Sequence, residues 1–97
     1  MVYKIYFSSR AERDLITSFE WYGEINRKVL KKFDSELDNV LKYIQQNPYQ
    51  FQIKYDNVRI AFLKKFPFGI HYIVNEDKIF VNSLFHTSQN SENWINK

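Results

Sequence analysis

The sequence contains no cysteine, and it has no long apolar run. Without cysteine the chain cannot form a disulfide framework, a thiolate zinc site or a cysteine nucleophile. No stretch approaches the roughly 18 apolar residues of a membrane-spanning helix. The first residues lack the apolar core of a signal peptide. There is also no internal repeat, low-complexity tract or linker, so we expect a soluble cytoplasmic protein with no membrane partner.

The length and composition are those of a small globular protein. Since a domain usually takes roughly 100–200 residues, we predict a single domain over residues 1–97. Aromatic residues are abundant at 19%, which suits a core and equally an interface. The net charge of +3 is compatible with nucleic acid or an acidic protein as partner, but it is too small to demonstrate either.

The first half of the chain predicts one strand and two helices. Residues 2–7 alternate with period two, which is typical of a strand. Ser8 and Ser9 offer N-cap hydroxyls for a helix that we expect to end at Gly23. A second amphipathic helix follows directly and stops at Asn47-Pro48, because the residue before a proline is disfavoured in the α region. Two helices joined so closely predict a helical hairpin.

The second half changes to strand-like patterns. We predict strands over 58–65, 68–74 and 79–85, and a short strand or loop over 51–55. A final helical turn is expected around Trp94. The order β-α-α-β-β-β predicts an α+β fold, in which an antiparallel sheet packs against the helical hairpin. The first strand is expected to join this sheet, because a lone strand leaves its backbone groups unpaired.

An ordered series of residues across nearly the whole chain resembles one known family. The series is Ala11, Asp14-Leu15, Trp21-Tyr22, Phe33, Leu37, Leu41, Ile44, Asn47-Pro48, Val58-Arg59, Leu63, Phe66-Pro67-Phe68, Ile70, Tyr72, His86 and Trp94. It is similar to that of the RelE/ParE superfamily, the toxins of type II toxin–antitoxin modules. The resemblance implies a RelE/ParE-like fold and a cognate antitoxin as partner, in a hetero-oligomeric complex.

The family divides into two activities. RelE-like members cut messenger RNA on the ribosome, whereas ParE-like members inhibit DNA gyrase by binding. RelE-like nucleases carry an arginine early in the strand after the hairpin turn, and that position falls on Gly69 here. The arginine common before the tryptophan is replaced by Gln89. Both departures favour the ParE branch, with DNA gyrase as target.

The alternative is an endoribonuclease with the ribosome and messenger RNA as partners, and whether the chain is an enzyme stays open. Its catalytic candidates are His86, as acid or base, and Arg59. His71 is expected to face away from the helices as a packed or half-exposed residue. We predict no metal and no cofactor, because the two histidines are far apart with no clustered carboxylates.

The candidate binding residues are basic, aromatic and amide side chains from the hairpin and the C-terminal segment. They are Lys54, Arg59, Lys64, Lys65, Phe66, Phe68, Gln89 and Trp94. Lysine and arginine supply charge-assisted bonds to phosphate or carboxylate groups. The other interpretation of the lysine pair is a solvated sheet edge protected against pairing. A third alternative is a degenerate family member that retains only antitoxin binding.

Overall fold

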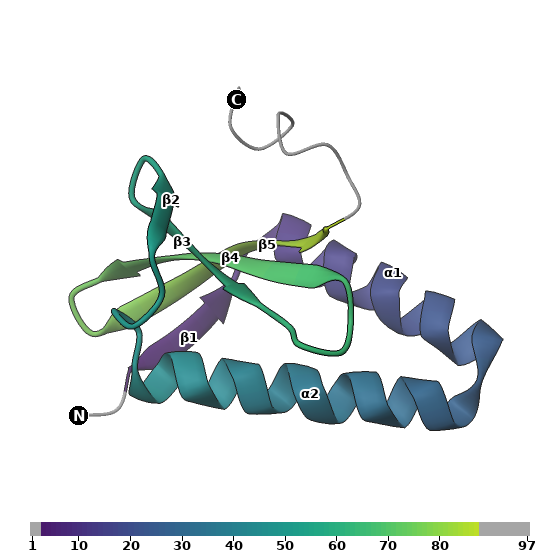
Figure 1. Ribbon diagram of the computed structural model, residues 1–97. Coiled ribbons are helices and arrows are strands. Elements are labelled where there is room, and N and C mark those ends of the chain that lie inside the picture. The colour runs from purple at the N-terminus through teal and green to yellow at the C-terminus, as the bar shows by residue number, and fades with distance from the viewer. Residues whose placement is uncertain (1–2, 88–97) are drawn as a thin grey trace.

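The computed structural model describes residues 3–87, and it has two helices and five strands (Figure 1). The elements are β1 (Lys4–Phe7), α1 (Ser9–Ile25), α2 (Arg27–Gln46), β2 (Ile53–Tyr55), β3 (Val58–Phe62), β4 (Phe68–Asn75) and β5 (Lys78–His86). The α+β class and the order of elements are as predicted. Gln89, Trp94 and the expected final helical turn lie outside the described residues.

The five strands form one sheet in the order β1-β5-β4-β3-β2. β2 to β5 pair antiparallel with their neighbours, as expected from the short turns between them. β1 joins the sheet as predicted, but it pairs parallel to β5, with Ile5 opposite Ile79. The sheet is therefore mixed. The two helices connect β1 to the later strands across one face of the sheet, and a crossover connection of this length permits parallel pairing.

One residue, Asn26, separates the two helices. Its backbone N–H donates to the carbonyl of Tyr22, and its side-chain Oδ1 accepts from the N–H of Lys28 at 2.7 Å. It therefore ends α1 and caps α2 at once. The predicted end at Gly23 is wrong: α1 continues to Ile25, since Gly23 does not adopt a left-handed conformation. Figure 1 shows the chain turning back at this point, so that α2 returns along the sheet.

Both helices cover the same face of the sheet and share one core. Tyr22 of α1 and Phe33 of α2 have ring centroids 4.8 Å apart, and both rings pack against Phe66 and Phe68. Aromatic pairs at these separations add to the stabilisation from buried area. This packing also settles which aromatic residue of the Trp21-Tyr22 pair turns inward. Tyr22 is buried, while Trp21 is 60% exposed.

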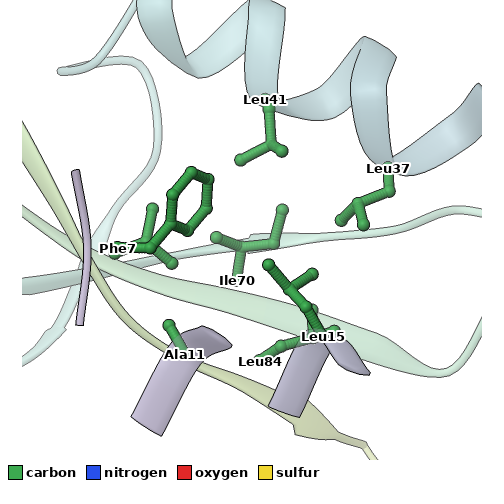
Figure 2. A pocket seen from close by; sticks show the side chains of 8 residues that line it. Phe7, Ala11, Leu15, Leu37, Leu41, Ile70 and Leu84 are labelled. Atoms are coloured by element: carbon green, nitrogen blue, oxygen red, sulfur yellow. The ribbon is translucent and has the colours of Figure 1, made fainter. Parts of the chain in front are cut away.

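A small apolar void lies where the two helices meet the sheet (Figure 2). Its volume is about 10 Å³, and aliphatic side chains with one phenylalanine line it. Figure 2 shows Leu37 and Leu41 pointing from α2 towards Ile70 of the sheet. An apolar space of this size is a packing defect and not a ligand site, because it offers a water no polar partner.

Candidate functional site

The β3–β4 turn is tied to two other elements of the fold. The N–H of Lys65 donates to Oε2 of Glu36 on α2 at 2.9 Å, and the N–H of Thr87 donates to the carbonyl of Pro67 at 2.7 Å. β3 ends at Phe62 and not at the predicted Lys65. The reason is that the backbone of Lys65 turns towards α2, so it cannot continue the pairing with β4.

The two aromatic residues of the turn pack inward. Phe68 is buried, and Phe66 is half-buried against Tyr22 and Phe33. Both rings therefore hold the turn against the helices. Packing accounts for their positions, and a binding role for Phe66 and Phe68 stays a prediction.

The two lysines of the turn are exposed. Within residues 3–87, the ion pair that forms joins Lys42 to Asp38 at 3.0 Å, and neither Lys64 nor Lys65 has a carboxylate partner in that range. Their ammonium groups are available to an anionic ligand or an acidic partner. Of all the predicted binding residues, these two fit the role best.

Arg59 has a structural role at the other end of β3. Its Nη1 donates to the carbonyls of Tyr49 and Phe51, and its guanidinium lies 5.1 Å from the centre of the Tyr49 ring. These contacts hold the segment between α2 and β2 against the sheet. Nearby Lys54 is exposed, and its Nζ lies 3.4 Å from the side-chain oxygen of Gln52.

Tyr72 supports the same segment from inside the core. Its hydroxyl donates to the carbonyl of Pro48 at 2.7 Å, in a buried hydrogen bond. Burial raises the pKa of Tyr72 to about 12, against the smaller opposing effect of the charge on Arg59. The phenol is therefore held neutral, as a hydrogen-bond donor, over the whole physiological range.

The structure does not bring the two catalytic candidates together. His86 pairs with Phe68 in the sheet, whereas Arg59 pairs with Tyr72. Four residues along β4 separate the two positions, which is about 13 Å along the strand. His86 instead borders a cleft of about 390 Å³ beside the exposed Trp21. Asp14 in that cleft already accepts the N–H of Leu84 at 3.1 Å.

A contact that the sequence did not suggest lies on the sheet face away from the helices. The hydroxyl of Tyr55 and Nδ1 of His71 are 3.1 Å apart, and the His71 ring lies 4.7 Å from that of Phe85. Burial raises the pKa of Tyr55, with a smaller lowering effect from Arg10 and a further raising effect from Asp56. His71 is only 1% exposed, so in this structure it is a packed residue. The alternation of β4 predicted its side of the sheet but not its partner.

Position 69, where a RelE-like nuclease would carry an arginine, has little space for a side chain. A Cβ atom on Gly69 would lie 3.0 Å from Cγ2 of Ile60 and 3.2 Å from two ring carbons of Phe62. The Phe62 ring therefore lies over the glycine. A longer side chain would have to displace it, because contacts of 3.0–3.2 Å are tighter than most Cβ contacts in proteins.

A groove runs between α2 and the outer edge of β3. It has a volume of about 540 Å³ and is lined by Glu36, Asn39, Val40, Tyr43, Phe51, Phe62 and Lys64. We call it the α2–β3 groove. It joins the lysine end of the turn to a partly exposed aromatic surface, a combination that suits a protein segment.

Neither a metal cluster nor a membrane span is found between residues 3 and 87. In that range no group of three His, Cys, Asp or Glu side chains is placed to hold a metal ion. No helix there is long and apolar enough to cross a membrane.

Comparison with known proteins gives a match in structure only. Neither the protein-family models nor the curated protein sequences match the chain. Among solved structures, it is similar to a chain described as "Chromosomal ParDE TA system from P. aeruginosa", with a TM-score of 0.75 and 19% identity. The similarity covers 88% of this chain and 96% of that one. The predicted RelE/ParE-like fold is confirmed.

Proposed function

We propose that this chain, which has the fold of the ParDE chain, is the toxin of a toxin–antitoxin pair. In this proposal it acts by binding DNA gyrase, and a cognate antitoxin neutralises it by covering its binding surface. The observation that carries the proposal is the fold likeness over 88% of the chain, at a TM-score of 0.75. Fold alone does not define activity, so the side chains have to decide between a binder and a nuclease.

The exposed residues favour a binder. Lys64 and Lys65 have no carboxylate partner among residues 3–87, and the α2–β3 groove beside them carries exposed aromatic surface. A cationic turn next to an apolar groove suits an acidic protein segment, because charge steers the encounter and apolar contacts hold the complex.

The candidate nuclease groups are poorly placed for RNA cleavage. In-line attack on a phosphate needs an acid, a base and a cation converging on one phosphate group. Arg59 uses its guanidinium on backbone carbonyls, and His86 pairs at the far end of β4 from it. Gly69 carries no charge and is covered by Phe62. The endoribonuclease therefore stays the alternative that the experiment has to exclude.

The test is induction of the chain in bacteria, alone and together with the protein encoded by the adjacent reading frame. We expect growth arrest on induction alone, recovery on co-expression, loss of negative plasmid supercoiling and intact transcripts. Purified chain should inhibit supercoiling by gyrase in vitro. The double variant Lys64→Ala/Lys65→Ala should weaken this inhibition, and the matched control Lys4→Ala/Lys78→Ala, at two exposed lysines on β1 and β5, should not.

Two other outcomes would contradict the proposal. Rapid cleavage of transcripts with unchanged supercoiling would replace the proposal with the endoribonuclease. Normal growth on induction, together with tight binding to the adjacent protein, would identify a degenerate member that only binds antitoxin.

A further inference from the structure

The outer edge of β3 is longer than the strand that covers it. β2 has three residues and pairs only with Val58 and Arg59, while β3 continues to Phe62. On its inner side β3 is fully paired with β4, from Arg59 to Phe62. The end of β3 near the turn therefore has a sheet neighbour on one side only, within the described chain.

The direction of the backbone groups at this edge follows from the pairing. The N–H of Leu63 donates to the carbonyl of Phe68, so Leu63 and Ala61 direct their backbone groups towards β4. In an antiparallel pair, successive residues direct their backbone groups to opposite edges of the strand, and Phe62 is the residue between Ala61 and Leu63. The N–H and C=O of Phe62 therefore point outward, beyond the end of β2, where an added strand would bind them.

The α2–β3 groove lies directly beside this edge. The groove has α2 as one wall and Phe62 with Lys64 as the other. Its exposed apolar surface includes Tyr43, which is 44% exposed and packs edge-on against Phe51 at 5.7 Å. An extended segment on the β3 edge would place alternate side chains over this surface, because side chains alternate along a strand.

The turn end of the groove is strongly basic. Lys64 lines the groove itself, and a neighbouring hollow of about 410 Å³ is lined by Lys31, Lys32 and Lys65. Glu36, the acidic residue shared by both, is already bonded to the backbone of Lys65. A second copy of this chain would bring its own lysines to the same edge, and like charges disfavour that pairing. The charge favours an acidic segment from a different protein.

We infer that an extended, acidic and apolar segment of the antitoxin adds to the edge of β3 at Phe62 and lies in the α2–β3 groove. Its apolar side chains contact Tyr43 and Phe51, and its carboxylates face the lysines of the turn. This inference rests on the proposed function, since it specifies where and how the neutralising partner binds.

The first test measures affinity for the protein encoded by the adjacent reading frame. We expect Tyr43→Asp to weaken binding by about tenfold or more, as for an aromatic residue at the centre of an interface. The matched control is Trp21→Asp, which changes another exposed aromatic residue on a helix and should leave the affinity within about twofold. Thermal unfolding of both variants shows whether each one folds.

The second test does not depend on any substitution. Amide hydrogen exchange, measured by NMR in the free chain and in the complex, should show strong new protection at Phe62. The amide of Ala61 points towards β4 and is already bonded in the free chain, so it serves as the internal control.

The outcomes separate the two proposals. If the adjacent protein neutralises the chain while Tyr43→Asp binds normally and the Phe62 amide gains no protection, the inference is overturned and the proposed function stands. If Phe62 is already protected in the free chain in a concentration-dependent way, a second copy occupies the edge and the inference fails. If the adjacent protein neither binds nor neutralises, both proposals fail.

Discussion

Replacing Gly69 by alanine tests whether the Phe62 ring closes position 69. The added methyl group would lie 3.0 Å from Cγ2 of Ile60, a buried side chain that would have to shift by a few tenths of an ångström. It would also lie 3.2 Å from the half-exposed ring of Phe62, which can swing outward. Overpacking of this kind typically costs about 1–3 kcal/mol. Replacing a glycine in a strand raises the free energy of unfolding by about 0.5–1 kcal/mol, because the unfolded chain has less conformational freedom.

The expected net effect of Gly69→Ala is a loss of about 1 kcal/mol in the free energy of unfolding. The decisive measurement is a double-mutant cycle with Phe62→Ala, which removes two of the three close contacts. In that background the space left by the ring lets Ile60 shift, so Gly69→Ala should be close to neutral, giving a coupling energy of about 1 kcal/mol. Urea unfolding followed by circular dichroism measures all four proteins, provided that the slope with denaturant stays constant.

The reasoning fails if the coupling energy is below about 0.3 kcal/mol, the size expected of independent sites. It also fails if Gly69→Ala alone stabilises the chain. Gly69→Arg extends the test to function. We expect it to destabilise the chain more than alanine does, because its side chain has to displace the Phe62 ring, and to confer no RNA cleavage.

Three further predictions concern Tyr72 and Asn26. Tyr72→Phe removes the donor to the buried carbonyl of Pro48 and should lower the free energy of unfolding by about 1–3 kcal/mol, measured in urea. The folded-state pKa of Tyr72, about 12, lies above the ordinary value of 10.0. Stability from this residue is therefore fully present below pH 10 and is lost as pH rises towards 12, by roughly 2–3 kcal/mol. The loss should be absent in Tyr72→Phe, and its persistence there would assign it to other groups. Asn26→Ala removes the N-cap of α2 and should lower the free energy of unfolding by about 1 kcal/mol. Asn26→Ser keeps a capping oxygen and should lower it less. Equal losses of stability in thermal unfolding would contradict the capping role.

The elements that the sequence predicts well are those with strong local signals. The end of α2 follows from the proline at 48, and the inward and outward faces of β4 follow from its alternation. The ends of α1 and β3, which the sequence predicted wrongly, depend on contacts with distant parts of the chain. α1 passes Gly23 because Asn26 can cap both helices, and β3 stops early because Glu36 of α2 takes the N–H of Lys65.

The candidate site was predicted only in part, for a similar reason. The basic pair at Lys64 and Lys65 is visible as a charge pattern, and both side chains are exposed as a binding role requires. Arg59 carries the same positive charge and is an equally good candidate from the sequence. In the structure, however, its guanidinium donates to backbone carbonyls of the segment after α2. The α2–β3 groove has no local signal, because it arises where a short β2 fails to cover a longer β3.

The parallel pairing of β1 with β5 has a consequence for how the chain folds during synthesis. Ser8, at the end of β1, donates to the carbonyl of Asn82, so strands from opposite ends of the described chain have to meet. Among the described residues, β5 is the last strand in the sequence, and it joins β1 to the rest of the sheet. Until β5 emerges, β1 has no strand to pair with and β4 has a bare edge. Pairings so distant in sequence form slowly and leave apolar surface exposed meanwhile. We therefore expect the sheet to be completed late, after nearly all of the described chain has been made.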